Sequence, residues 1–238
     1  MIPKSHPRYA SLMTRDKIVS GVDRGITSTH GLIAHGRGEA FDYLLGEKTN
    51  KFALESIDAA ARLLLRARHP VISVNGNVAA LCPKEIAQLS EAIPAQVEVN
   101  IFHASKEREG RIKEWLKANG AREVLVPGKG IIPTIDHNRR YTNENGILIA
   151  DVVFVPLEDG DRCEALIKMG KKVITVDLNP LSRTARASTI TIVDNIIRAM
   201  PLLIRRVKQL KGKKAKKVRY NNKKVLKKSL KYIAKRFS

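Results

Sequence analysis

From residue 70 onward, short apolar runs alternate with amphipathic segments, and this alternation restricts the possible folds more than any other feature of the chain. Strands are expected at 71–74, 97–102, 123–126, 151–155, 172–176 and 189–193. Helices are expected over 83–92, 105–118 and 162–169, and again from residue 195. Strands and helices that alternate across short connections form parallel sheets covered on both faces. The predicted fold class is therefore α/β, with a Rossmann-like, mostly parallel sheet.

The first part of the chain lacks this alternation and is predicted to be helical. Apolar residues keep helical spacing from Phe52 to His69, and residues 39–45 are expected to form a short amphipathic helix. The predicted organisation is a helical N-terminal segment packing on the core over 1–69, an α/β core over 70–210, and a basic Lys-rich tail over 211–238.

The net charge of +21 is concentrated near the C-terminus. Residues 205–238 hold 16 of the 44 Lys and Arg residues and none of the 23 acidic ones, which leaves the rest of the chain at +5. Leu226, Leu230, Ile233 and Phe237 fall on one face of a basic amphipathic helix. Such a helix favours weak contact with nucleic acid or an anionic surface. The alternative function is therefore an RNA- or ribosome-associated protein that acts through this tail. Truncation near residue 210 distinguishes the two: an RNA-associated protein would lose its function, whereas an enzyme would keep its catalytic activity.

The remaining composition points to a cytoplasmic protein without a membrane span. Cys82 and Cys163 have neither metal-like nor CxxC spacing and are expected to be buried thiols in a reducing compartment. No run approaches the roughly 18 apolar residues of a membrane-spanning helix. The N-terminus lacks the apolar core of a secretory signal.

One loop combines the groups that a nucleotide needs. Residues 177–186 directly follow a predicted strand, and ligands of open α/β sheets bind beyond the carboxyl ends of the strands. Asp177 and Asn179 offer a carboxylate and an amide to ribose or base. Arg183 and Thr184 offer a guanidinium and a hydroxyl to phosphate. The loop is predicted to form one wall of a nucleotide site; the alternative is a surface loop with solvated arginines.

Three carboxylates follow the strand expected at 151–155. Glu158, Asp159 and Asp161 carry the oxygen ligands that suit Mg²⁺ bound to nucleotide phosphates. They also stand where acids cap the next helix, and capping is the expected role of at least one of them, Asp161 first.

Glycines flank Arg37 in a second cluster. Gly36 and Gly38 precede the helix expected at 39–45, where backbone N–H groups would be free to bind an anion. The alternative is a simple turn in which Arg37 pairs with a nearby acid. His35 is either a proton carrier or a hydrogen-bonded structural residue.

Amides follow two further strands. Asn75 and Asn77 end the first strand and either contact a small polar substrate or form a plain turn. Asn195 either caps the last body helix or contacts a ligand. The sequence contains no P-loop and no GxGxxG fingerprint, which disfavours a second alternative, a nucleotide-dependent oxidoreductase.

Five strings resemble the archaeal phosphopantothenate synthetases, also called 4-phosphopantoate–β-alanine ligases. They are Ile2–Tyr9, Gly31–Tyr43, Val74–Leu81, Val155–Arg162 and Asp177–Arg183. The resemblance spans about residues 2 to 205, whereas the basic tail looks unlike the tails of the family.

The resemblance implies a homodimeric, ATP-dependent ligase that condenses 4-phosphopantoate with β-alanine, releasing AMP and diphosphate, in coenzyme A biosynthesis. Contacts to ATP are implied at Arg15, Arg37, Asp177, Leu178, Asn179, Arg183, Thr184, Asn195 and Ile196. Arg37 and His35 are the candidate catalytic residues, and Asn75 and Asn77 the candidate substrate contacts. Glu158, Asp159 and Asp161 are the candidate ligands of Mg²⁺ or of the β-alanine ammonium group.

Overall fold

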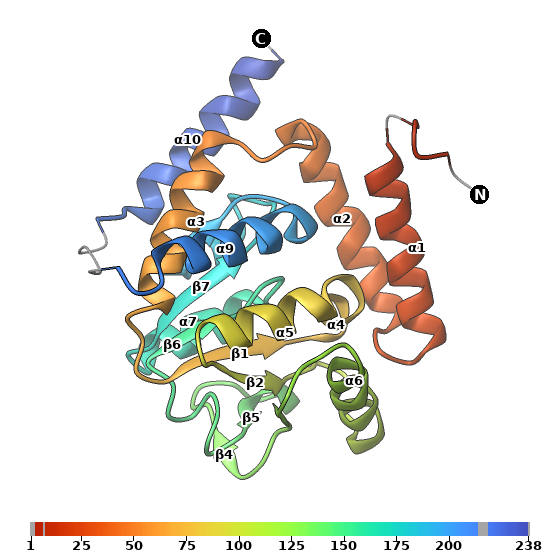
Figure 1. Ribbon diagram of the computed structural model, residues 1–238, viewed down its shortest axis with the longest axis vertical. Helices are drawn as coiled ribbons and strands as arrows, with labels where there is room; N and C mark the ends of the chain where they lie inside the picture. Colours follow the sequence, from red (N-terminus) through yellow and green to blue (C-terminus); the bar gives the residue numbers. More distant parts are fainter. Residues whose placement is uncertain (1–2, 7, 214–218, 238) are drawn as a thin grey trace.

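A six-stranded, fully parallel sheet forms the centre of the molecule (Figure 1). The computed structural model describes residues 3–6, 8–213 and 219–237. The strands are β1 (Pro70–Val74), β2 (Gln96–Val99), β3 (Val124–Leu125), β6 (Val152–Phe154), β7 (Lys172–Val176) and β8 (Ile190–Ile192). Each overlaps a strand expected from the sequence, and the predicted α/β fold class is confirmed.

The order of the strands fixes where a ligand can bind. It is β3-β2-β1-β6-β7-β8, so the chain first builds outward from β1 to β3 and then returns to the other side of β1. The two halves therefore diverge between β1 and β6. In open parallel sheets the crevice at the carboxyl ends of two such strands is the usual ligand site.

Most strand residues are buried because both faces of the sheet are covered. Ile72, Phe154 and Ile174 belong to one buried cluster, whereas their neighbours Val71 and Val153 belong to a second cluster on the opposite face. Successive side chains of a strand point to opposite faces, so a run that is buried on both reads as continuously hydrophobic.

Helices on both faces supply these clusters. On one face α3 (Lys51–Leu64), α5 (Pro83–Ala92) and α9 (Ile196–Leu210) pack on one another, while α7 (Gly160–Lys168) belongs to the cluster on the other face. The remaining connections contain α4 (Gly76–Leu81), α6 (Lys106–Ala118) and α8 (Arg183–Ala187). Pro83 stands at the first position of α5, where a missing N–H removes no helical hydrogen bond.

The N-terminal segment is helical, and two long helices precede α3. They are α1 (Tyr9–Asp23) and α2 (Thr29–Leu45), which lie side by side at one edge of the molecule (Figure 1). The prediction that a helix begins at residue 39 after a glycine-flanked turn is wrong, because α2 starts ten residues earlier, with extended Ser28 at its N-cap. Gly36 and Gly38 are therefore interior helix residues without free N–H groups for an anion.

The segment expected to be a loop over 127–147 contains short regular elements. These are β4 (Gly130–Ile131), the 3-10 helix η1 (Asn138–Arg140) and β5 (Tyr141–Thr142), with β4 and β5 antiparallel. Buried Glu98 of β2 holds the segment in place by accepting hydrogen bonds from Thr142 Oγ1 (2.5 Å) and Ile147 N (2.7 Å).

The basic C-terminal region ends in a helix that packs on the body. This is α10 (Asn222–Arg236), which contacts α2, α3, α8 and β8. Val225 and Leu226 are buried in the main core, whereas Phe237 at the end of the expected apolar face is 65% exposed. Residues 214–218 of the predicted tail lie outside the described residues.

Among the described helices, none combines enough length with enough apolar character to cross a membrane.

Candidate functional site

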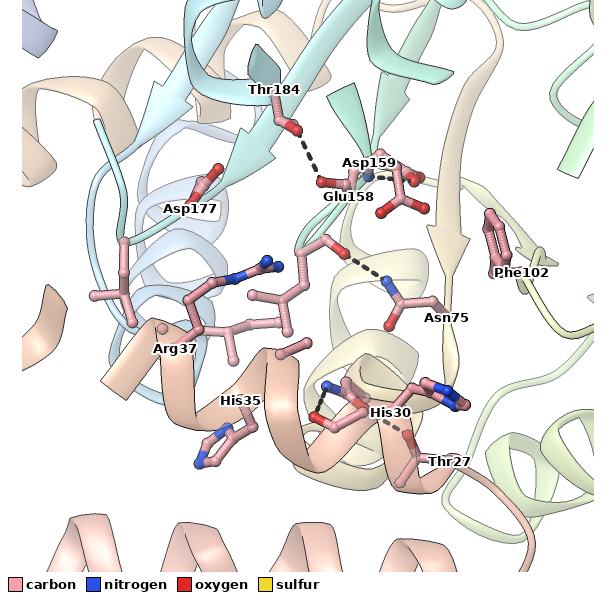
Figure 2. Close-up of a pocket in the computed structure, with 18 of the residues that line it drawn as sticks. Thr27, His30, His35, Arg37, Asn75, Phe102, Glu158, Asp159, Asp177 and Thr184 are labelled. Atoms are coloured by element: carbon pink, nitrogen blue, oxygen red, sulfur yellow. Dashed lines mark hydrogen bonds between the residues drawn. The ribbon is translucent and has the colours of Figure 1, made fainter. Parts of the chain in front are cut away.

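A polar cavity of about 660 Å³ lies at the carboxyl ends of β1 and β6, the point predicted by the strand order. Its size falls within the roughly 300–1,000 Å³ of small-molecule sites. One wall is α2, and the facing wall consists of the segments that follow β1, β2, β6, β7 and β8. Figure 2 shows the two walls, with Arg37 and His30 on α2 and Asp177, Glu158 and Asn75 facing them.

The cavity gathers most of the candidate site residues. Those that line it are His35, Arg37, Asn75, Asn77, Glu158, Asp159, Asp177, Leu178, Asn179, Arg183, Thr184, Asn195 and Ile196. Arg15 and Asp161 do not line it. Candidate residues from five separate stretches of the sequence thus meet at one place.

The loop after β7 is shaped by its own polar side chains. Asp177 accepts hydrogen bonds from Asn179 N (2.9 Å) and from the hydroxyl of Ser182, which in turn caps α8 by accepting from Ala185 N (2.9 Å). Burial raises the pKa of Asp177, and the Ser182 hydrogen bond and the charge of Arg37 act against that rise. The loop therefore presents a fixed carboxylate rather than a mobile surface turn.

Arg37 makes no hydrogen bond or ion pair with any residue that the structure describes. Figure 2 shows its side chain extending from α2 towards Asp177 and Thr184. Its neighbour Gly38 faces Leu178, and a Cβ on Gly38 would lie 3.6 Å from the Leu178 side chain. The guanidinium group is thus free to bind an anion in the cavity.

His35 and Arg37 leave α2 in opposite directions, since residues two apart on a helix lie roughly 200° apart. His35 borders the cavity, but its ring points away from Asn75 and Glu158 (Figure 2). Burial lowers the pKa of His35, and nearby Glu39 opposes the shift. The imidazole lies on the side of α2 that faces α1.

Arg15 lies on that same side. Its guanidinium contacts the Glu39 carboxylate at 2.9 Å and Tyr43 Oη at 3.1 Å, and the Glu39 hydrogen bond raises its pKa. The side chain remains 46% exposed. Within a single subunit, Arg15 is therefore held at Glu39, which lines the cavity, although Arg15 itself does not line it.

The amides at the ends of the strands hold the walls together. Asn75 donates to Leu157 O (2.8 Å) across the switch point and accepts from Val78 N (3.1 Å), which caps α4. Asn77 donates to Gly31 O (3.0 Å) and thereby ties α4 to α2. Gly31 has no space for a Cβ because Asn77 and Thr27 side chains stand there.

Two further polar residues join the elements around the cavity. Thr184 Oγ1 donates to Glu158 O (2.8 Å), which links α8 to the segment after β6. Asn195 caps α9 by accepting from Ile197 N (3.2 Å) and also donates to Asp42 (2.9 Å). The capping role expected of Asn195 is confirmed, and the same residue lines the cavity.

Each of the three carboxylates after β6 contacts at least one basic residue, and Glu158 and Asp159 share Arg139. Buried Glu158 is paired with Arg162 and with Arg139 (2.9 Å), Asp159 is paired with Arg139, and Asp161 contacts His137 (2.7 Å). Across the described chain, no three His, Cys, Asp or Glu side chains are arranged to hold a metal ion.

The N-cap position of α7 differs from the sequence expectation. Asp159, not Asp161, occupies it, and no side-chain hydrogen bond caps this helix. Asp161 lies in the first turn and accepts from Arg162 N (2.8 Å).

Arg139 and Arg162 are buried residues that the sequence argument missed. Arg162 is fully buried, donates to Glu158 and to Ser73 Oγ (3.1 Å), and its Nε and Nη2 have no partner in the described structure. Arg139 comes from η1, inside the segment expected to be a loop, and donates to Asn100 Oδ1 (3.0 Å). Apolar and polar residues alternate over Val97, Glu98, Val99 and Asn100. This alternation was a sequence signal that polar side chains would pack on one face of β2.

A doubly wound parallel sheet with a polar cavity at its switch point defines an α/β protein that binds small ligands at the carboxyl edge of the sheet. A model described as phosphopantothenate/pantothenate synthetase matches residues 52–236. The chain belongs to this family. The match includes α10, so the expectation that the resemblance ends near residue 205 is wrong.

Relatives from three archaeal organisms are similar over most of their length. A Thermococcus kodakarensis protein is 55% identical over 212 residues, which cover 88% of this chain and 81% of that protein. A Methanosarcina mazei protein is 49% identical over 237 residues, covering 98% and 94%. A Methanospirillum hungatei protein is 55% identical over 205 residues, covering 86% and 84%. Each is named 4-phosphopantoate–β-alanine ligase. These similarities give no support to the alternative of an RNA-associated protein.

Proposed function

We propose that this chain is a 4-phosphopantoate–β-alanine ligase, which uses ATP to form 4′-phosphopantothenate, AMP and diphosphate. The observation that carries the proposal is the identity of about half to relatives of that name across nearly the whole chain. The cavity supports it, because most of the residues implied by the family resemblance line it, and among them Arg37 forms no ion pair with a described residue.

ATP occupies the end of the cavity formed by the segments after β7 and β8. Asp177 and Asn179 bind the adenosine, while Arg37, Arg183 and Thr184 bind phosphate. Arg183 now pairs with Glu164 at 2.8 Å, but its side chain is 58% exposed, so the exchange of this surface pair for a phosphate is inexpensive.

Activation of the carboxylate precedes amide formation. A carboxylate oxygen of 4-phosphopantoate attacks the α-phosphorus of ATP, and the bond to diphosphate breaks, which leaves an acyl adenylate. The unprotonated amine of β-alanine then attacks the acyl carbon, and AMP departs with the bonding electrons. Both steps gather negative charge, which Arg37 stabilises from a preorganised position. Asn75 and Asn77 fix the wall against which the substrate lies.

Mg²⁺ accompanies ATP and is held chiefly by phosphate oxygens, the usual arrangement for this ion. The three acids after β6 do not fit a protein-built metal site, because Glu158 is buried against two arginines and Asp161 lies outside the cavity. Asp159, which is 52% exposed and lines the cavity, is the one of the three that we assign to the ion.

The working unit is a homodimer in the cytoplasm. Val19 and Ile33 are exposed apolar residues on α1 and α2, at 49% and 71%, and they support a subunit contact there. Cys82 and Cys163 are free and buried, which suits a reducing compartment. Contact of the α10 lysines with nucleic acid or an anionic surface stays a prediction.

A coupled assay tests the reaction. Purified protein is expected to release AMP from ATP only when 4-phosphopantoate and β-alanine are both present. Release of ADP, or AMP formation that does not depend on β-alanine, would rule the proposal out.

A further inference from the structure

Arg108 is a half-buried cation without a carboxylate partner. It lies on α6 and lines the cavity, and its guanidinium donates only to the carbonyl oxygens of Ile26 (3.3 Å) and His103 (3.2 Å) among the described residues. Burial lowers its pKa, and no neighbouring acid opposes that shift. Since a guanidinium group stays charged in proteins, its charge is left to be balanced by something that enters the cavity.

The other arginines of the cavity differ from Arg108. Arg139 is paired with Glu158 and Asp159, and Arg183 is paired with Glu164. Arg37 alone shares with Arg108 the absence of a carboxylate partner in the described structure. The cavity thus holds two arginines that form no ion pair with a described carboxylate, one on α2 and one on α6.

Arg37 and Arg108 lie at different ends of the cavity. Figure 2 shows Arg37, Asp177 and Thr184 at one end and His30, Thr27 and Phe102 at the other. Arg108 belongs to the second end, because it donates to Ile26, next to Thr27, and to His103, next to Phe102.

Two histidines accompany Arg108 at that end. The rings of His30 and His103 lie 4.9 Å apart, and Phe102 packs on His103 with ring centroids 5.1 Å apart. All three residues line the cavity. Imidazole N–H groups beside a guanidinium provide several donors to one anion, the arrangement that a phosphate group requires.

The backbone makes room for the Arg108 side chain. A Cβ on Gly76 would lie 2.8 Å from Arg108 Nη2 and 2.6 Å from Ile26 O. The absence of a side chain at Gly76 therefore lets the guanidinium reach the cavity wall beside Asn75 and Asn77, the amides already placed against the substrate.

We infer that Arg108, with His30 and His103, binds the phosphate group of 4-phosphopantoate and selects it over unphosphorylated pantoate. The inference rests on the proposed function. With its phosphate held at this end, the substrate directs its carboxylate along the cavity towards Arg37 and the ATP α-phosphate. The phosphates of ATP could bind to the same cationic group, and the experiment distinguishes ATP from 4-phosphopantoate as its ligand.

The test compares substrates in the full-length Arg108→Gln variant, with Arg111→Gln on the same helix as the matched control. Arg111 is exposed, pairs with Glu107 and does not line the cavity. For Arg108→Gln, kcat/KM for 4-phosphopantoate is expected to fall about 10- to 100-fold, the usual effect of losing a charged hydrogen-bond partner. The KM for ATP and the slow rate with pantoate are expected to stay within about twofold of wild type.

Three outcomes would overturn the inference. One is an unchanged preference for phosphorylated substrate, another is an equal loss with pantoate, and the third is a selective rise in the KM for ATP. His103→Gln is a second test variant, in which Arg108 can still donate to the backbone carbonyl of residue 103. We expect this variant also to lose preference for 4-phosphopantoate over pantoate, but by a smaller factor than Arg108→Gln. Failure of the proposed function is distinguishable, because the wild-type protein would then form no AMP with any of these substrates.

Discussion

The side-chain amide of Asn222, the first residue of α10, donates to the carbonyl oxygen of Ala185 in α8 at 2.7 Å. The same amide donates to Ser188 O (3.0 Å), and Asn222 Oδ1 accepts from Thr191 N (2.9 Å). At its other end, α10 reaches α2, where Arg236 donates to Tyr43 O (2.9 Å). The basic C-terminal helix therefore holds both walls of the cavity.

Replacing Asn222 with Ala is expected to weaken ATP binding. The change removes the side-chain donor of Ser188 O and the acceptor of Thr191 N, and it leaves Ala185 O with Thr191 Oγ1 as its side-chain donor, at a cost of about 1–3 kcal/mol in unfolding free energy. It also loosens α8, which carries Arg183 and Thr184, so the KM for ATP should rise. Urea unfolding and initial-rate kinetics measure the two effects. Lys223→Ala, on the exposed adjacent residue, is the control; equal effects in both variants would contradict the role of Asn222.

Deletion of residues 211–238 should lower the unfolding free energy and the activity more than Asn222→Ala does. The sequence alone suggested that such a truncation leaves catalysis intact. Because the deletion exposes the core contacts of Val225 and Leu226, we now expect a less stable protein with poor activity.

Arg37→Ala is expected to abolish ligation without unfolding the protein. The side chain has no partner in the described structure whose loss would destabilise the fold. Loss of one preorganised charge from the site lowers kcat by about 10²–10³-fold. Arg186→Ala, at an exposed arginine outside the cavity, should keep wild-type activity. An Arg37→Ala enzyme with near-normal AMP release would remove Arg37 from the site.

Mixing two inactive variants shows whether subunits share a site. Arg15 does not line its own cavity and is paired with Glu39, so we expect it to act on the cavity of the other subunit in the proposed dimer. Arg15→Ala and Arg37→Ala proteins, each inactive, should then complement after mixing. Random exchange gives half mixed dimers with one intact site each, about a quarter of wild-type activity. No recovery after confirmed exchange would place Arg15 and Arg37 in one subunit's site or outside it.

Glu158→Gln is expected to act on stability rather than on metal dependence. Glu158 and its partner Arg162 are almost fully buried, and removing one charge of a buried pair costs about 3–5 kcal/mol. Asp159→Asn, at an exposed acid, should be close to wild type in stability but should need more Mg²⁺ for half-maximal rate. Thermal unfolding and Mg²⁺ titrations of the rate separate these cases. A stable Glu158→Gln protein with impaired Mg²⁺ dependence would restore Glu158 as a metal ligand.

Asp58 is expected to make stability depend on acidic pH. Burial opposes its ionisation, but hydrogen bonds from Arg62 and Arg206 outweigh burial and lower the pKa of Asp58. A depressed pKa in the folded state means stability that is present above the unfolded value of about 3.9 and lost as pH falls through the folded value. Wild type should thus exceed Asp58→Asn in unfolding free energy at pH 6 but not near pH 2. The control is Asp23→Asn, an exposed acid; a constant difference across this range would contradict the linkage.

The sequence predicted the sheet because buried parallel strands carry their own signature. In runs such as Lys172–Val176 every residue after the first is buried, and Asp177 directly after that run marked the carboxyl edge. The start of α2 was predicted ten residues too late because Gly36 and Gly38 indicated a turn, whereas both lie inside the helix. Glycine lowers intrinsic helix stability by only about 1 kcal/mol, and packing against neighbouring elements outweighs so small a preference.

The sequence by itself determined the parallel α/β class and the chemical groups of the site, since both follow from local patterns: strand and helix periodicity, and polar residues after strands. The tertiary structure alone decided which charges remain free. Arg139 and Arg162 neutralise Glu158 from distant segments, Glu39 holds Arg15, and Arg37 and Arg108 are left unpaired in the cavity. Charge pairing depends on distances between residues far apart in the chain, and only the folded arrangement of the helices sets those distances.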